Sequence, residues 1–136
     1  MRAPSHTFED HTADVRLRVE APDLAALLEE AGRALGELMG GGAPGPLGDP
    51  VRVRVEAPDR AALLVRWLDE LVFLSETEHR VWTDIHVARA EDRSVEAVVR
   101  GPTVEALRTA IKAATFHDLH VDDLADGIRA CVVLDV

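Results

Sequence analysis

The stretch of sequence that decides the fold occurs twice. Residues 15–28 are VRLRVEAPDLAALL and residues 51–64 are VRVRVEAPDRAALL. Both copies open with apolar residues alternating with arginine, a period of two that is typical of a strand with one buried face. A proline then ends the strand, and the aspartate after it, Asp23 or Asp59, can cap a new helix. The repeat therefore predicts two β-to-α units of similar sequence.

Apolar residues continue at spacings of three and four after each cap. This spacing predicts a helix with one apolar stripe that ends at Gly40, and a second helix that runs to Leu74. Trp67 falls on the stripe of the second helix and is predicted to fill the core. The Gly/Pro-rich stretch 40–48 predicts an irregular connector, and it lacks the Gly-Lys-Ser/Thr ending of a phosphate-binding loop.

Strand patterns dominate the rest of the chain. We expect strands at 81–90 and 95–100, joined by a polar turn, and a final strand at 128–136 that is buried on both faces. Residues 103–114 favour neither helix nor strand, whereas 115–121 have an extended pattern. This order predicts an α+β fold: a two-layer sandwich in which a mostly antiparallel sheet is covered on one face by two helices.

Composition limits the class of protein and of partner. The 136 residues are 47% hydrophobic and 29% charged, which is typical of one packed domain spanning 1–136. A balance of 15 basic against 25 acidic residues gives a net charge of -10, so we expect no direct binding to nucleic acid or to a membrane. The single Cys131 cannot form an internal disulfide and is expected to be a small buried apolar residue. Because no segment has the pattern of a signal peptide or a membrane span, we expect a cytoplasmic protein.

Acidic residues mark both ends of the chain. The segment DHTAD at 10–14 places two carboxylates and an imidazole just before the first repeated strand. Asp135 and the terminal carboxylate of Val136 place two anions at the end of an otherwise apolar strand. Oxygen ligands of this kind suit Ca²⁺ or Mg²⁺, so a divalent cation that bridges Asp14 to Asp135 and Val136 is physically sensible. A solvated turn and a frayed C-terminus explain the same residues at least as well.

Other polar residues give weaker signals. Lys112 is the only lysine, and its place between Ile111 and Ala113 fits either a plain surface charge or a specific cation at a binding edge. His117 and His120 are three residues apart, which puts them on opposite faces of a strand and argues against a joint zinc site. The sequence shows no nucleophile paired with a base.

Four motifs together resemble the archease family. They are DHTADV at 10–15, RWLDEL at 66–71, IKAATFH at 111–117 and VVLDV at 132–136, and they span nearly the whole chain. Archeases are small proteins that assist the RtcB-type RNA ligase, promoting its guanylylation and its multiple turnover in tRNA splicing or RNA repair. The resemblance implies the same role here: a non-catalytic protein whose partner is an RtcB-type RNA ligase.

The resemblance also implies a site. Asp14, Asp135 and Val136, the last through its terminal carboxylate or backbone oxygen, are the implied ligands of a divalent cation, with Ca²⁺ expected and Mg²⁺ or Mn²⁺ as alternatives. Lys112 and His11 are the implied functional residues in ligase activation. Two other functions stay open: a general protein chaperone with an exposed apolar face, and a metal-dependent small-molecule hydrolase that uses Asp14 and His11.

Overall fold

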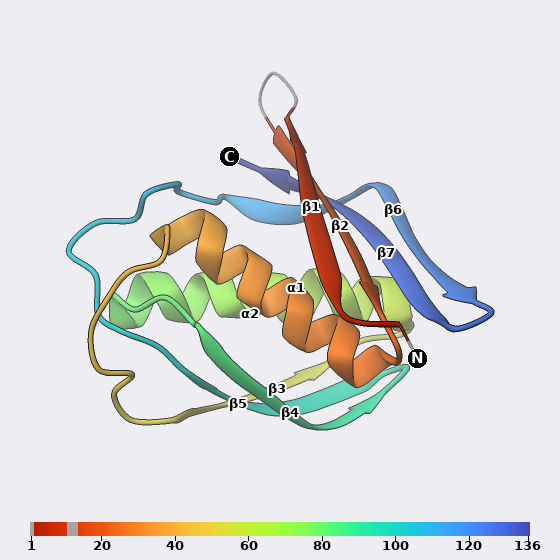
Figure 1. The fold of residues 1–136 in the computed structure, drawn as a ribbon, viewed down its shortest axis with the longest axis horizontal. Coiled ribbons are helices and arrows are strands. Elements are labelled where there is room, and N and C mark those ends of the chain that lie inside the picture. The colour runs from red at the N-terminus through yellow and green to blue at the C-terminus, as the bar shows by residue number, and fades with distance from the viewer. Residues whose placement is uncertain (1, 11–13) are drawn as a thin grey trace.

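The strands form two antiparallel sheets, and both helices lie between them (Figure 1). This computed structural model describes residues 2–10 and 14–136. One sheet has four strands in the order β1-β2-β7-β6, and the other has three in the order β3-β5-β4. The strands are β1 (Ser5–Asp10), β2 (Asp14–Ala21), β3 (Val51–Glu56), β4 (Asp84–Glu91), β5 (Ser94–Arg100), β6 (Ala113–Leu124) and β7 (Gly127–Asp135). The helices are α1 (Leu24–Gly40) and α2 (Arg60–Glu78).

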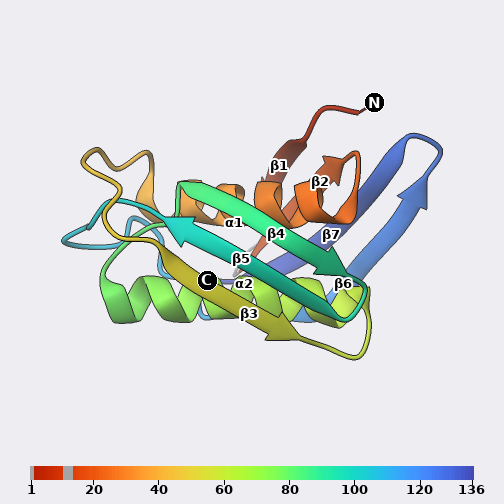
Figure 2. The ribbon, with the colours of Figure 1, turned by 90° about the horizontal axis from the view of Figure 1, so that it is seen from below.

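The α+β class with two helices packed against antiparallel strands is confirmed, but the strands divide between two sheets instead of one. α1 contacts β2 in the larger sheet and β4 in the smaller, and α2 contacts β6 and β3. Figure 2 shows the three-stranded sheet lying over both helices. The physical reason is the width of the buried arc: residues 62–65 of α2 are all buried, which is too broad for one apolar stripe. A helix buried on more than one side needs a layer on each.

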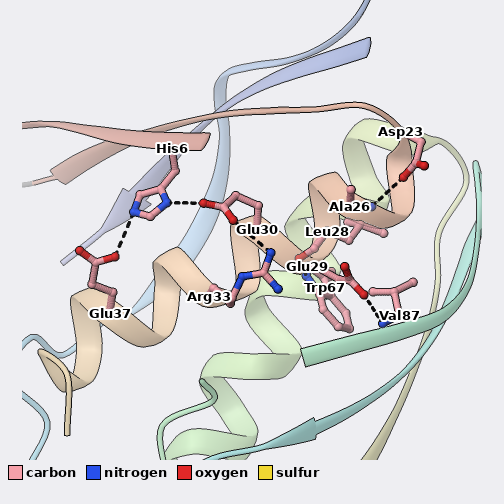
Figure 3. Close-up of polar contacts among 10 residues, drawn as sticks. All are labelled: His6, Asp23, Ala26, Leu28, Glu29, Glu30, Arg33, Glu37, Trp67 and Val87. Carbon is pink, nitrogen blue, oxygen red and sulfur yellow. Dashed lines mark hydrogen bonds and ion pairs between the residues drawn. The ribbon is translucent and has the colours of Figure 1, made fainter. Parts of the chain in front are cut away.

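The two predicted β-to-α units are β2-α1 and β3-α2, and their caps form as the repeat predicts. Asp23 Oδ1 accepts a hydrogen bond from the Ala26 N–H at 2.8 Å (Figure 3), and Asp59 Oδ1 accepts one from the Ala62 N–H at 2.8 Å. α1 is closed by Gly41, whose φ of 57° lies in the left-handed region that favours glycine. Local sequence therefore determines where both helices begin.

Apolar burial is continuous from one sheet through the helices to the other. Trp67 is fully buried, as predicted, and its indole N–H donates to the Leu28 carbonyl at 2.8 Å. Trp82 donates to the Leu71 carbonyl at 3.2 Å in the same way. Cys131 is buried in β7, as predicted. No helix in the described part of the chain combines the length and the apolar character needed to cross a bilayer.

Several elements differ from the pattern-based expectations: α2 ends at Glu78 rather than at Leu74, and β6 spans Ala113–Leu124 rather than 115–121. The sequence pattern does not predict β1, because SHTFED is short and mostly polar, yet this strand pairs with β2 along its whole length. β4 begins at Asp84 rather than at 81. Residues 101–112 are irregular apart from one bridge between Arg80 and Thr103. β6 therefore follows a long irregular segment and forms one edge of the larger sheet.

Arg80 fixes the irregular connector between the two units. Its guanidinium is buried, with Nε donating to the Gly101 carbonyl at 3.0 Å and Nη2 donating to the carbonyls of Leu47 and Asp49, each at 2.7 Å. Its Cζ lies 4.8 Å from the centre of the Trp82 ring, within the range of a cation–π contact. The connector is irregular, as predicted, but hydrogen bonds to a distant arginine hold it in place.

Candidate metal centre

The register of the larger sheet brings the two ends of the chain together. Asp14, the first residue of β2, lies directly opposite Asp135, the last residue of β7. Ala113, the first residue of β6, also pairs with Asp135, and the Lys112 N–H donates to the Asp135 carbonyl at 2.8 Å. Figure 1 shows the C-terminus close to the start of β2. Asp14, Asp135 and Lys112 therefore gather at one end of the sheet. His11 lies outside the described residues.

One oxygen at this end of the sheet is buried without a partner. Asp14 Oδ1 is buried and has no hydrogen-bond donor in the described structure. The cationic residue on the same face of β2 is Arg16: its Nη2 pairs with Asp118 Oδ2 at 3.2 Å, and its Nε is also buried without a described hydrogen-bond partner. In the described part of the chain no ion pair joins Arg16 to Asp14. Among the described residues, Asp14 Oδ1 therefore has no hydrogen-bond donor, and Arg16 does not form an ion pair with it.

A hard divalent cation fits this arrangement. Carboxylates on directly opposed residues repel each other, and a buried polar atom without a partner costs about 1–3 kcal/mol. A bound cation would offset both costs, because Ca²⁺ and Mg²⁺ take carboxylate, carbonyl and water oxygens as ligands. The described residues contain no group of three His, Cys, Asp or Glu side chains able to hold an ion. A cation held by Asp14 and Asp135 would therefore need further oxygen ligands, such as backbone carbonyls and water.

The C-terminus is packed rather than frayed. Val136 is half-buried and packs against the core cluster. The residue before it, Asp135, pairs with both β2 and β6. Backbone and side-chain contacts therefore fix the position of the last two residues, as a ligand role for them requires.

Lys112 is exposed, but its backbone is held at this end of the sheet. Ile111, directly before it, is fully buried, and the Lys112 N–H is bonded to Asp135. The side chain therefore extends from a fixed backbone position beside the acidic pair. This placement distinguishes Lys112 from a charge on a loose surface loop.

Sequence patterns do not assign a role to Asp69, a residue of α2 that contacts this region. Its Oδ1 accepts a hydrogen bond from the Ala114 N–H at 2.7 Å. Burial raises the pKa of the Asp69 carboxyl above its ordinary 3.8, and the hydrogen bond from Ala114 opposes that rise. The signals in the sequence are its place in the RWLDEL motif and the position of a carboxylate directly after Leu68, which lies on the apolar stripe of the helix.

A histidine held by two carboxylates ties β1 to α1 (Figure 3). His6 Nδ1 lies 2.7 Å from Glu30 Oε2, and His6 Nε2 lies 3.0 Å from Glu37 Oε2. Burial acts to raise the pKa of Glu30, but hydrogen bonds from His6 and Arg33 outweigh it and hold that pKa below the ordinary 4.5. These contacts therefore hold β1, the partner strand of β2, against α1.

Glu30→Gln is expected to lose about 1 kcal/mol of unfolding free energy near pH 7, where the ionised Glu30 accepts charged hydrogen bonds. A carboxyl with a lowered folded-state pKa stabilises above its ordinary value of 4.5, and that stability is lost as the pH falls below it. Thermal unfolding from about pH 7 to about pH 3 should therefore show the variant and wild type converging in acid. A difference that stays constant across this range would contradict the assignment. Exposed Glu76→Gln is the matched control.

The two histidines of β6 do not form a metal site with described partners. The expectation of opposite faces assumed a regular strand, whereas the register shifts between Thr115 and His120 and Asp118 has a φ of 51°. His117 Nε2 lies 3.2 Å from Asp118 Oδ2 and its side chain is exposed. As noted for the described residues, no metal-holding group includes either histidine.

Exposed apolar side chains are sparse. Among the described residues, the large apolar side chains that are exposed are Phe73 on α2, at 59%, and Phe116 on β6, at 65%. A general chaperone needs a broad exposed apolar patch. This surface does not favour that function. The hydrolase alternative depends on His11, which lies outside the described residues.

The family model and the similar curated proteins agree on one family. The model of the Archease protein family (MTH1598/TM1083) matches residues 6–136. The protein archease of Archaeoglobus fulgidus is 32% identical over 135 residues, which cover 96% of this chain and 98% of that one. The protein archease of Methanosarcina acetivorans is 30% identical over 141 residues, with 96% of this chain and 95% of that one covered.

Two solved structures share the fold. The solution structure of Methanobacterium thermoautotrophicum protein 1598 superposes with a TM-score of 0.78 at 29% identity, covering 96% of this chain and 98% of that one. A crystal structure from Thermotoga maritima, described as an archease and possible chaperone, gives a TM-score of 0.65 at 23% identity, covering 100% and 98%. At that identity the second likeness supports the fold alone.

Proposed function

The chain belongs to the archease family, and from that membership we propose that it is a non-catalytic activator of an RtcB-type RNA ligase. In this proposal residues 1–136 act as one domain in the cytoplasm and promote guanylylation and multiple turnover of the ligase in tRNA splicing or RNA repair. The observation that carries it is the register that sets Asp14 opposite Asp135, with Lys112 bonded to the same residue.

The proposed site is the end of the larger sheet where β2, β6 and β7 meet. Asp14, Asp135 and Val136 hold a divalent cation, with Ca²⁺ favoured and Mg²⁺ or Mn²⁺ as alternatives. When bound, such an ion supplies positive charge that can neutralise phosphate oxygens near the nucleotide site of the ligase. Lys112 adds an ammonium from a fixed backbone position, and His11 contributes from the segment just before Asp14.

The partner is a protein rather than free RNA. The net charge of -10 opposes association with a phosphate backbone. Binding to the ligase needs only local complementarity around the site, and a divalent ion held there offsets most of the negative charge of the carboxylates. The chain therefore acts on the ligase, and RNA is contacted by the ligase alone.

The test is guanylylation and multiple-turnover ligation by the ligase with wild-type protein, Asp14→Ala, Asp135→Ala and Lys112→Ala. Each variant is expected to lose about 10-fold or more of the stimulation, because each removes a ligand or a charge from the site. Two controls match them in charge. Asp84→Ala removes the aspartate at the first residue of β4, and Arg52→Ala removes an exposed cation of β3. Equal stimulation by all these proteins would contradict the proposed site.

A further inference from the structure

We infer that Asp69 is a positioning residue for the proposed site: from α2 it holds the first residues of β6, and thereby keeps Lys112 beside the Asp14–Asp135 pair. This inference rests on the proposed function, because that function gives the end of the sheet its role. Asp69 touches neither acidic residue of the pair in the contacts described above, so it acts through the backbone of β6.

The contact is direct and well placed. Asp69 Oδ1 lies 2.7 Å from the Ala114 nitrogen, and α2 packs along β6. Ala114 follows Ala113, which pairs with Asp135, and Lys112 donates to the Asp135 carbonyl at 2.8 Å. Ala114, which Asp69 holds, is therefore two residues along the chain from Lys112, whose side chain is proposed to act.

Besides the bond to Asp69, this piece of β6 is held by its pairing with β7 and by the buried side chains of Ile111 and Ala114. Residues 113–115 pair with β7, but the register then shifts and regular pairing resumes only at His120. On the other side, residues 101–112 are irregular, and β6 is an edge strand with β7 as its one neighbour in the sheet. Thr115 Oγ1 adds a bond to the Val133 carbonyl at 3.1 Å. The hydrogen bond to Asp69 thus ties α2 to a short paired segment that has irregular backbone on both sides.

The chain contains a matched contact away from the site. Glu29 of α1 accepts a hydrogen bond from the Val87 N–H at 2.8 Å (Figure 3), and the register of β4 also shifts just after Val87. Both carboxylates are half-buried, and each ties a helix to a strand at an irregularity. Glu29 contacts the three-stranded sheet and lies away from the proposed site. A variant of Glu29 therefore distinguishes general support of the fold from a role at the site.

The variants are Asp69→Ala, Asp69→Asn and Glu29→Ala. Asp69→Asn keeps an oxygen that can accept the Ala114 N–H and removes a carboxylate whose ionisation burial disfavours. It is expected to behave as wild type. Asp69→Ala removes the acceptor. Amide hydrogen exchange at residues 112–115 is expected to become about 10-fold faster in Asp69→Ala. Affinity for Ca²⁺ measured by calorimetry is expected to fall about 10-fold, because the same segment holds the proposed ligand Asp135: Ala113 pairs with it, and the Lys112 N–H donates to its carbonyl. Glu29→Ala should speed exchange near Val87 and leave Ca²⁺ affinity unchanged.

Several outcomes would overturn the inference. They are unchanged exchange at residues 112–115 in Asp69→Ala, equal Ca²⁺ affinity in Asp69→Ala and Glu29→Ala, or failure of Asp69→Asn to restore affinity. Global unfolding of Asp69→Ala while Glu29→Ala stays folded would assign Asp69 to folding and overturn it too. Failure of the proposed function looks different: wild-type protein would then not stimulate the ligase, whereas the exchange result at 112–115 would still decide what Asp69 holds.

Discussion

Arg80→Met is expected to lower the free energy of unfolding by about 3 kcal/mol, because buried carbonyl oxygens lose their donor. Methionine keeps much of the arginine's apolar length but donates no hydrogen bond. It would leave the carbonyls of Leu47, Asp49 and Gly101 without the three bonds that Arg80 makes. Its contact with the Trp82 ring would also lose its cationic component.

Urea denaturation followed by tryptophan fluorescence measures this effect, since one tryptophan lies beside Arg80. The control is Arg54→Met: Arg54 is 69% exposed and pairs with Glu56 and Glu96 at the surface, so its loss should change stability by less than about 0.5 kcal/mol. Equal midpoints for the two variants would contradict the anchoring role of Arg80.

Gly101→Ala is expected to cost about 3 kcal/mol or more, because a Cβ at this position would meet backbone rather than a movable side chain. The added carbon would lie 1.6 Å from the Val81 carbonyl oxygen, so one of the two chain segments must shift. The same shift would disturb the hydrogen bonds that Gly101 makes with Leu47 and Arg80.

Gly42→Ala is the informative control. Gly42 has a φ of 80° and no atom within 4 Å of an added Cβ, so the cost there is backbone strain of about 1 kcal/mol alone. Gly101 has no such positive φ, and its cost comes from the close approach of Val81. In thermal unfolding, the midpoint temperature of Gly101→Ala should therefore lie well below that of Gly42→Ala. The opposite ranking would contradict the packing described for this crossing.

Local sequence predicts the two β-to-α units because their determinants are close together in the chain. Alternation, proline and an aspartate cap fall within 14 residues of each repeat, and both caps form at 2.8 Å. The division into two sheets is not local. It depends on a helix being buried on more than one side. The burial of residues 62–65 of α2 shows this, but that burial is known only from the structure.

The candidate site also has features that the sequence predicts and features that it does not. Residue types predict the acidic ends and their preference for a hard cation, and pairing of β2 with β7 is what places Asp14 opposite Asp135. The supporting contacts could not be predicted from residue pattern, because Asp69 and Ala114 are 45 positions apart and Arg80 and Leu47 are 33 apart. An edge strand interrupted by a register shift also lacks the regular alternation by which strands are recognised.

The central claim is that Asp14 and Asp135 hold one divalent cation between β2 and β7. Calorimetric titration of the metal-free protein with Ca²⁺, and separately with Mg²⁺ and Mn²⁺, tests it without the ligase. We expect one ion per chain for wild type, a loss of about 10-fold or more in affinity for Asp14→Asn and Asp135→Asn, and unchanged affinity for Asp84→Asn. Absence of binding by wild type, or equal binding by all four proteins, would contradict the claim.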